Sequence, residues 1–373
     1  MGFFILVFIV HTLVNAYLFI KGWKALPSGK IIKTVYCFLY FIVYGSFIIA
    51  MLGRNALPLS VQKPLYMIGT GWLAVMLYAT LYFLLTDLLY LINKYRSFLP
   101  ASWTKKPRWN KIQTQSACLL VFLLLSYGYF QFTHPTIVEQ DIYITKNGNN
   151  RKELKAVGIS DLHLGITVGK ARLKKYVEQI NALNPDIILI AGDMIDNNLY
   201  PLIKEKMWEE LNNLKAPLGV YMCLGNHEYL SGIEQSLDFL DRTSLNVLID
   251  RSVRIDDSFY LIGRNDLLAK KRSSLQALTD SLDQSMPIIL LDHEPFHLEE
   301  AEENKIDFQF SGHTHNGQLF PLNFIVSRIF ELPHGYKQKG NTHYYVSSGL
   351  GLWGPQFRIG TQSEILVFNI KFN

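Results

Sequence analysis

Cysteine is scarce in this chain, and acidic residues are scarce in its first third. The 373 residues include only three cysteines, so a small secreted fold held together by disulfide bonds is excluded. Residues 1–133 hold 12 Lys and Arg but a single acid, Asp87, whereas residues 134–373 hold 24 Lys and Arg and 30 Asp and Glu. Because the charge changes sign along the chain, no uniform basic surface exists and no nucleic-acid partner is expected.

Charged residues are also missing from four long apolar stretches in the first third. These stretches are 2–20, 34–53, 64–86 and a shorter one centred on 117–132. About 20 helical residues, at ~1.5 Å each, cross a hydrocarbon core of ~30 Å. A bundle of four transmembrane helices is therefore predicted for residues 1–133, the fourth with help from its flanks. A cleaved signal peptide is not expected, because nothing basic precedes the first stretch and three more follow it.

The short loops between the stretches predict an orientation in the membrane. Lysine and arginine are concentrated in the first and third loops, whereas the second loop has only Arg54 and Lys63. Basic loops tend to stay in the cytoplasm, so everything after Phe132 is predicted on the outer side of the cytoplasmic (inner) membrane. Three basic residues after the fourth stretch weaken this bias: Lys146, Arg151 and Lys152.

Residues 154–373 show the pattern of a layered α/β domain, reached through a linker or first strand at 134–153. Five short apolar runs are typical of buried strands: 156–160, 187–191, 220–224, 288–291 and 308–310. Residues 170–182 have apolar residues at helical spacing. The predicted architecture is an α-helical transmembrane bundle followed by an α/β domain.

Each of these five runs leads into polar residues that can bind a metal. The five motifs are Asp161-Leu-His163, Gly192-Asp193, Gly225-Asn226-His227-Glu228, Asp292-His293 and Gly312-His313-Thr-His315. Carboxyl ends of parallel strands meet at one edge of a sheet, so these groups are expected to converge. Oxygen and imidazole donors without thiolate suit Mn, Fe or Zn, and the lack of cysteine clusters argues against a closed structural zinc site.

Two divalent cations in such a site would attract phosphate. Asp161 and Asp193 supply two negative charges against four positive ones, and neutral His and Asn ligands add none. Two ions ~3.5–4 Å apart can hold the nonbridging oxygens of a phosphoester and lower the pKa of a bound water toward ~7. Phosphoester hydrolysis is therefore the predicted reaction. The alternative is that the motifs only cap helices and form turns.

The five motifs, in this order, resemble those of the calcineurin-like metallophosphoesterases over about residues 154–373. The segments Asp161-Leu-His-Leu-Gly165, His313-Thr-His-Asn-Gly-Gln318 and Val346-Ser-Ser-Gly-Leu-Gly351 resemble the bacterial membrane-associated branch of that superfamily. Asn316 and Thr361-Gln362 depart from the branch, which affects the expected substrate preference more than catalysis. The resemblance implies a two-sheet sandwich flanked by helices.

The resemblance also implies a role for each residue of the motifs. One metal would be held by Asp161, His163, Asp193 and His315, and the other by Asp193, Asn226, His293 and His313, with Asp193 as the bridge. His227 resembles a histidine that contacts phosphate and is a candidate to protonate the leaving oxygen, and Asn226 would also face the substrate. Asp196 is a candidate to orient these groups. Arg264 is a candidate for gripping phosphate, with a solvated surface position as its alternative.

The attachment to four membrane helices predicts a membrane-associated substrate. The expected partners are the lipid bilayer and a phosphate-containing substrate, for which a lipid is a candidate. No obligate protein partner is inferred. The apolar segment Leu319 to Tyr336 is either an interfacial lid or a packed segment. Three alternatives stay open. They are a UDP-diacylglucosamine pyrophosphatase-type lipid enzyme, which works from the cytoplasmic side, an inactive relative, and a membrane sensor or transport-associated binding protein.

Overall fold

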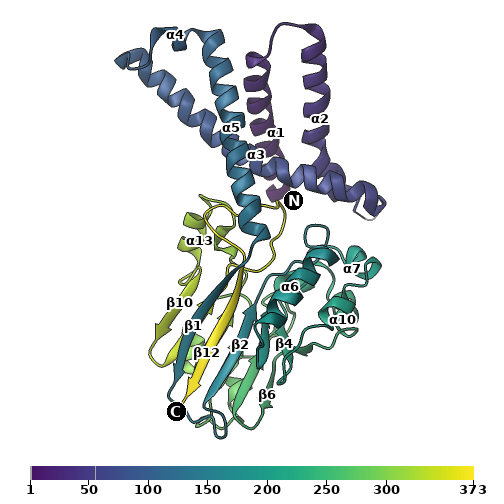
Figure 1. Cartoon of the computed structure of the whole chain (residues 1–373), viewed down its shortest axis with the longest axis vertical. Helices are drawn as coiled ribbons and strands as arrows, with labels where there is room; N and C mark the ends of the chain where they lie inside the picture. Colours follow the sequence, from purple (N-terminus) through teal and green to yellow (C-terminus); the bar gives the residue numbers. More distant parts are fainter. Residues whose placement is uncertain (1, 55) are drawn as a thin grey trace. The chain divides into compact units, whose positions relative to one another are not determined.

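The computed structural model describes residues 2–54 and 56–373 (Figure 1). The chain divides into two compact units. The helical unit runs to Tyr129 and includes Gly354–Phe357, and the sandwich unit comprises Phe130–Trp353 and Arg358–Asn373. The division therefore falls slightly before residue 133, the end of the predicted membrane part, because the last turn of the fourth long helix packs into the sandwich unit.

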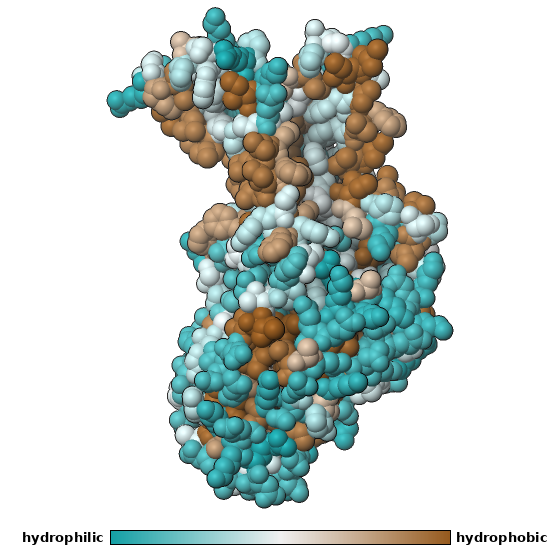
Figure 2. All heavy atoms as spheres, in the orientation of Figure 1, coloured by the Kyte–Doolittle hydropathy of each residue, from teal (hydrophilic) through white to brown (hydrophobic). Residues whose placement is uncertain are grey.

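The helical unit contains the first three predicted transmembrane stretches and most of the fourth. Its helices are α1 (Gly2–Ala25), α2 (Lys30–Leu52), α3 (Leu59–Arg96), the single turn α4 (Ala101–Thr104) and α5 (Lys106–Thr133), whose last four residues belong to the sandwich unit. Among the described residues, α1, α2, α3 and α5 are long and apolar enough to cross a membrane. On the face shown in Figure 2, much of the surface of these helices is apolar, whereas the surface of the sandwich unit is mostly polar around an apolar patch. The helices extend beyond the uncharged stretches because lysine and arginine continue them at their ends.

The only acid of residues 1–133 ties three of these helices together. The carboxylate of Asp87 on α3 forms an ion pair with Lys21 on α1. It also accepts hydrogen bonds of 2.8 Å from the Tyr17 hydroxyl and from the Gln113 amide on α5. A charge within an apolar bundle is costly unless it is paired, so these partners explain how Asp87 is accommodated.

The sandwich unit consists of two six-stranded sheets, which confirms the predicted α/β sandwich. One sheet has the order β1-β12-β2-β3-β4-β5 and the other β10-β11-β9-β8-β7-β6. The strands of the first sheet are β1 (Thr136–Ile144), β12 (Glu364–Phe372), β2 (Glu153–Ile159), β3 (Ile187–Ala191), β4 (Val220–Cys223) and β5 (Asn246–Leu248). Those of the second are β10 (Gly335–Lys339), β11 (Thr342–Val346), β9 (Phe308–Ser311), β8 (Ile288–Leu291), β7 (Phe259–Gly263) and β6 (Arg251–Ile255).

The five apolar runs of the sequence form inner strands of these sheets. Strands β2, β3 and β4 are parallel, and so are β8 and β9. Strand β1, which pairs in parallel with β12, occupies part of the predicted linker at 134–153. Parallel pairing directs all of these strand ends to one edge, which is what places the polar motifs together.

Alternation along β3 shows why its sequence is apolar throughout. Ile187 and Leu189 belong to the core between the two sheets, whereas Ile188 and Ile190 belong to the core under the helices. In the core between the sheets, the ring of Phe368 lies 4.9 Å from the ring of Phe308. A strand covered on both faces buries every side chain, so it lacks the alternation of a half-exposed strand.

Short helices cover the outer faces of the sandwich. They are α6 (Lys170–Ala182), α7 (Tyr200–Lys204), α8 (Trp208–Leu211), α9 (Asn226–Leu230), α10 (Ile233–Leu240), α11 (Leu275–Thr279), α12 (Glu299–Glu303), α13 (Asn323–Ile329) and the 3₁₀ turn η1 (His315–Gly317). Helix α6 buries Leu173, Val177 and Ile180 on one face, as its sequence spacing predicts.

Candidate metal centre

The five polar motifs meet where β2, β3, β4, β8 and β9 end. The first three strands belong to one sheet and the last two to the other, so both sheets contribute to one site. The structure brings together eight of the nine predicted site residues: Asp161, His163, Asp193, Asn226, His227, His293, His313 and His315. The ninth, Arg264, is not one of the candidate ligands.

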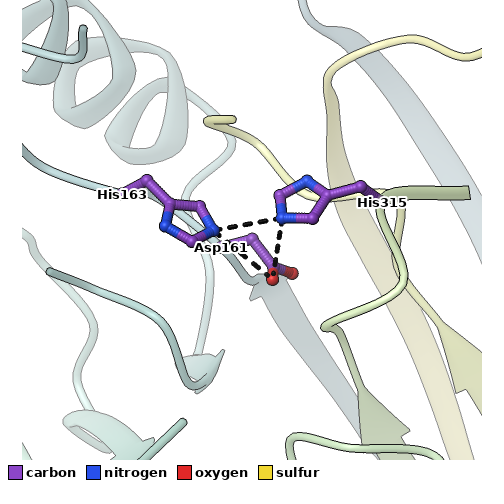
Figure 3. A group of neighbouring side chains, drawn as sticks. All are labelled: Asp161, His163 and His315. Atoms are coloured by element: carbon purple, nitrogen blue, oxygen red, sulfur yellow. Dashed lines mark hydrogen bonds and ion pairs between the residues drawn. The ribbon is translucent and has the colours of Figure 1, made fainter. Parts of the chain in front are cut away.

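The first group of candidate ligands is Asp161, His163 and His315 (Figure 3). The Nε2 atoms of the two histidines lie 3.1 Å apart. The Oδ1 atom of Asp161 lies 3.4 Å from Nε2 of His315 and 3.9 Å from Nε2 of His163. Ligand atoms ~2.0–2.2 Å from one zinc-like cation lie roughly 3–3.5 Å from one another. The group therefore has nearly the dimensions of a single-ion site.

The second group is formed by Asn226, His293 and His313, next to Asp193. Nε2 of His293 lies 3.2 Å from Oδ2 of Asp193 and 3.2 Å from Oδ1 of Asn226. Nδ1 of His313 lies 3.0 Å from the same Asn226 oxygen. These three residues come from the ends of β4, β8 and β9, so the second group joins the two sheets.

Asp193 lies between the two groups. Its Oδ2 atom is 3.6 Å from Nε2 of His163 in the first group and 3.2 Å from Nε2 of His293 in the second. Its Oδ1 atom accepts a 2.9 Å hydrogen bond from the backbone N–H of His227. One carboxylate oxygen thus faces both groups while the other holds the side chain in place, which is the geometry of a bridging ligand.

The charges of the site fit a cation. Asp161 is fully buried, and this burial raises the pKa of its carboxyl to about 7. Burial also holds the pKa of His163 and of His315 well below the usual range, so both rings are neutral and have an electron pair to donate. Buried carboxylates are costly without positive charge nearby. Divalent cations would supply that charge, and the donor set suits Mn, Fe or Zn.

The backbone at the site is strained. Five of the candidate ligands have positive φ angles: 52° at Asp161, 47° at His163, 52° at Asp193, 70° at His313 and 49° at His315. The left-handed region costs a residue with a Cβ ~1–3 kcal/mol, and such residues concentrate at functional sites. The repetition of this conformation indicates that the strand ends are shaped to aim these side chains at a common centre.

Glu228 clamps the turn that carries Asn226 and His227. Its fully buried carboxylate accepts backbone hydrogen bonds from Gly225 (2.7 Å), Ile195 (3.0 Å) and Asp193 (3.2 Å). A Cβ on Gly225 would lie 2.6 Å from the backbone nitrogen of Asp193, so only glycine allows this close approach. This role of Glu228 was not predicted from the sequence. Its position three residues after the helix N-cap, as in a capping box, was the available signal.

Replacing Glu228 by glutamine should lower metal affinity by about 10–100-fold, the usual effect of losing a residue that orients ligands. The amide NH₂ cannot accept hydrogen bonds from backbone N–H groups, so one side of the clamp is lost. Calorimetric titration of the metal-stripped protein with Mn²⁺ measures the change. Glu234→Gln, at an exposed position on α10, is the matched control. Equal affinities in the two variants would show that Glu228 does not position the ligands.

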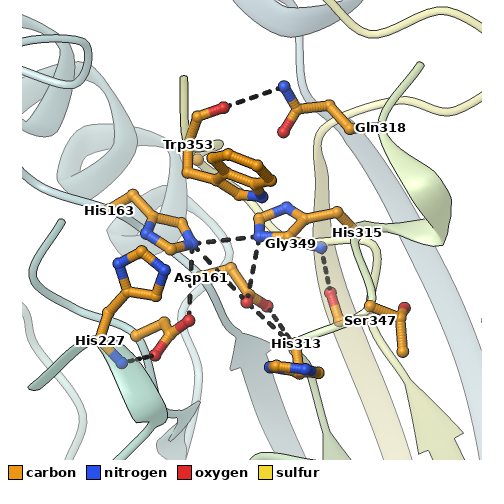
Figure 4. Close-up of polar contacts among 12 residues, drawn as sticks. Asp161, His163, His227, His313, His315, Gln318, Ser347, Gly349 and Trp353 are labelled. Carbon is orange, nitrogen blue, oxygen red and sulfur yellow. Dashed lines mark hydrogen bonds and ion pairs between the residues drawn. The ribbon is translucent and has the colours of Figure 1, made fainter. Parts of the chain in front are cut away.

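His227 lies at the edge of the two groups, beside His163 (Figure 4). The two rings are 4.5 Å apart and nearly perpendicular. Nδ1 of His227 lies 3.3 Å from the carbonyl oxygen of Asp196 and 3.7 Å from its carboxylate, which leaves Nε2 for another partner. Asp196 also lies 3.8 Å from Nδ1 of His163, and its burial raises its carboxyl pKa to about 6. Its position fits the predicted orienting role.

Arg264 is buried and not on the solvated surface that was its alternative, and its contact with phosphate stays a prediction. Its buried guanidinium lies 3.2 Å from Oδ2 of Asp292 and 2.6 Å from Oε2 of Glu300. Arg272 binds Asp292 as well, at 2.6 Å. Because β7 and β8 are parallel neighbours, the residues after them come together, and the charge of Arg264 is neutralised by carboxylates.

Arg358 supports the centre, a role that was not predicted from the sequence. Its fully buried guanidinium donates hydrogen bonds to the carbonyl oxygens of Gly349 (2.9 Å) and Gly351. The backbone N–H of Gly351 in turn donates to the carbonyl of Asp161 at 3.0 Å. Arg358 thus stabilises the loop at 349–351, and this loop holds the backbone of the candidate ligand Asp161 in place. A lone arginine in an irregular segment carries no sequence signal for this role.

Comparisons with known proteins agree with this geometry. Residues 154–317 match the family described as calcineurin-like phosphoesterase. The chain is 37% identical to an uncharacterized metallophosphoesterase of Helicobacter pylori J99 over 256 residues, which are 65% of this chain and 68% of that protein. This chain belongs to the calcineurin-like metallophosphoesterases. The predicted family and enzyme class are confirmed: the metallophosphoesterase is a metal-dependent phosphoester hydrolase.

One further relative matches along almost the whole chain, membrane part included, and another is named as a transmembrane protein. The uncharacterized metallophosphoesterase Cj0846 of Campylobacter jejuni is 30% identical over 384 residues, with 99% of this chain and 98% of that protein covered. A protein of Danio rerio named transmembrane protein with metallophosphoesterase domain is 32% identical over 276 residues, which cover 69% of this chain and 63% of that protein. With its four apolar helices, the metallophosphoesterase is a membrane-associated phosphoesterase.

Proposed function

We propose that this metallophosphoesterase hydrolyses a phosphomonoester, phosphodiester or diphosphate bond of a membrane-associated substrate with a pair of divalent cations. The observation that carries the proposal is the Asp193 oxygen that faces both ligand groups. Asp161, His163 and His315 would hold one ion and Asn226, His293 and His313 the other. When bound, two such ions supply positive charge for the phosphate oxygens and lower the pKa of a bound water, which becomes the nucleophile.

The residues of the chain would orient the phosphate and move a proton. Asn226 directs its side-chain oxygen to His293 and His313, so its NH₂ group is left for a phosphate oxygen. His227 is held at Nδ1 by the carbonyl oxygen of Asp196, so Nε2 is left to contact phosphate and, when the ring is in its imidazolium form, to give its proton to the leaving oxygen. Asp193 fixes the position of His227 relative to the candidate metal ligands, because its Oδ1 atom accepts a hydrogen bond from the backbone N–H of His227.

The membrane-associated substrate is inferred from the way the two parts of the chain are joined. Helix α5 ends at Thr133 and β1 begins at Thr136, so two residues separate a membrane-type helix from the sandwich. Phe132, in the last turn of α5, is fully buried in the core of the sandwich unit. A domain attached without a flexible linker works close to a bilayer, which favours substrates that stay there.

A metal-dependence assay tests the proposal. The full-length protein in detergent should hydrolyse bis-p-nitrophenyl phosphate, lose this activity with EDTA and regain it with Mn²⁺. A panel of glycerophosphodiesters, nucleotide diphosphate lipids and lipid monophosphates then identifies the substrate. If no member of the panel is hydrolysed with Mn, Fe or Zn, the proposal fails and a binding or sensor protein becomes the better account.

We also propose that the chain is a multi-pass protein of the cytoplasmic membrane with an extracytoplasmic sandwich unit. The support is the concentration of basic residues in the first and third loops. A reporter that works only outside the cytoplasm should be active when fused after Asn373. Activity of a cytoplasmic reporter alone would reverse the orientation and favour a UDP-diacylglucosamine pyrophosphatase-type enzyme.

A further inference from the structure

Helix α13 and the turn before it form an exposed apolar surface on the sandwich unit. None of the residues of α13 is buried. Five large apolar side chains, which we call the apolar ridge, are exposed: Phe320, Leu322, Phe324, Ile325 and Ile329. Phe324, Ile325 and Ile329 each keep more than half of their surface accessible, at 54%, 54% and 57%. Apolar side chains gathered in this way mark an interaction surface.

The apolar ridge begins at the end of the sandwich unit where α5 enters it. The backbone N–H of Phe320 donates a 2.7 Å hydrogen bond to the carbonyl of Ile359. Four residues later in the same loop, the N–H of Ser363 lies 3.5 Å from the carbonyl of Gln131 in the last turn of α5. The loop at 359–363 therefore connects the ridge to the end of a membrane-type helix.

The apolar ridge is also next to the metal centre. The ring of Phe330, directly after α13, lies 5.9 Å from the ring of His313. The side chain of Gln318, two residues before the ridge, donates a 3.0 Å hydrogen bond to the carbonyl of Trp353. The half-exposed Trp353 lies beside His163 and His315 in Figure 4. An apolar surface, an exposed tryptophan and the candidate ligands thus share one region.

The charge of this region favours a lipid partner. The sequence holds no acid between Asp307 and Glu331, and Arg328 on α13 is exposed. Aromatic residues with an arginine and no carboxylate suit the boundary between headgroups and acyl chains, above all in anionic membranes. A protein partner could cover the same side chains, but only a bilayer is already implied by the helix that enters beside them.

We propose that the apolar ridge is a membrane-contact surface, whose side chains insert among the lipid headgroups of the bilayer that anchors the chain. It holds the metal centre close to the headgroups. A phosphate in a lipid headgroup would then reach the centre without the lipid leaving the bilayer. This last consequence rests on the proposed function, whereas lipid contact by the ridge does not.

Photolabelling tests the contact. The full-length protein carries p-benzoylphenylalanine in place of Phe324 and is reconstituted into vesicles of phosphatidylethanolamine and phosphatidylglycerol. Tyr143 is the matched control position, because it is 59% exposed and lies seven residues along β1 from Thr136, ~23 Å at ~3.3 Å per residue. Irradiation should give roughly 10-fold more lipid adduct at position 324 than at 143, because an inserted side chain lies among acyl chains.

The outcomes separate this inference from the proposed function. Labelling needs no turnover. A lack of lipid adduct in an active enzyme therefore refutes only the lipid contact of the apolar ridge. Lipid adduct in an inactive enzyme refutes only the proposed function. Ile325 serves as a second labelling position, and hydrolysis of bis-p-nitrophenyl phosphate or metal binding reports whether each variant is folded. Equal lipid yields at the ridge and at position 143, or cross-links to protein in place of lipid, would overturn the inference.

Discussion

Asp193→Asn is expected to lower kcat/KM for phosphoester hydrolysis by ~10³-fold or more, because two cations supply several kcal/mol of transition-state stabilisation. Burial opposes a charge on Asp193, yet His293 close by holds the pKa of this carboxyl well below its usual range. The site is therefore arranged for an anion at this position. The neutral amide cannot balance the charge of two cations, and its NH₂ group has no electron pair to offer to a cation.

Metal analysis and circular dichroism distinguish this effect from unfolding. The variant should keep its secondary structure but lose bound metal after dialysis against metal-free buffer. Asp238→Asn is the matched control, because Asp238 is exposed on α10 and outside the ligand groups. If Asp193→Asn retains both the metal and the activity of the control, Asp193 is not a bridging ligand.

His227→Ala should keep its metal but lower turnover by ~10²–10⁴-fold, the range for loss of a general acid. His227 lies close enough to His163 and Asp193 to share a metal with them, but its Nδ1 atom is directed at Asp196. The role of proton donor predicts a dependence on the leaving group. The loss should be largest for an alkyl phosphodiester and much smaller for a p-nitrophenyl ester, whose leaving oxygen needs no proton.

The control for this experiment is His297→Ala. The side chain of His297 is 66% exposed and pairs with Glu299 on α12, so its removal should leave turnover unchanged. The same loss with both substrates, together with a lower metal content, would show that His227 is a metal ligand. Turnover equal to that of His297→Ala would remove His227 from the mechanism altogether.

The convergence of the motifs could be predicted from the sequence because it depends on a simple rule. Strands such as 187–191 are apolar throughout and end in polar residues, and parallel strands end at one edge. Applying this rule needs only the sequence, because the order of apolar and polar residues along the chain shows where each strand ends. The four membrane-type helices were equally predictable, since their length and lack of charge are properties of the sequence itself.

The supporting residues could not be predicted in this way. Arg358 acts on a loop that returns to Asp161 from nearly 200 residues further along the chain, and Arg264 is neutralised by Asp292 through the pairing of β7 with β8. Both contacts are made by side chains across the fold, so residue type and local spacing do not reveal them. The contact of Arg264 with phosphate was predicted from its positive charge alone.

Anomalous X-ray diffraction from the Mn²⁺-loaded protein would locate the bound cations. We expect two peaks ~3.5–4 Å apart, the usual separation in two-metal sites. One peak should lie among Asp161, His163 and His315, the other among Asn226, His293 and His313, with Asp193 touching both. A single peak, or peaks away from these side chains, would contradict a two-cation centre.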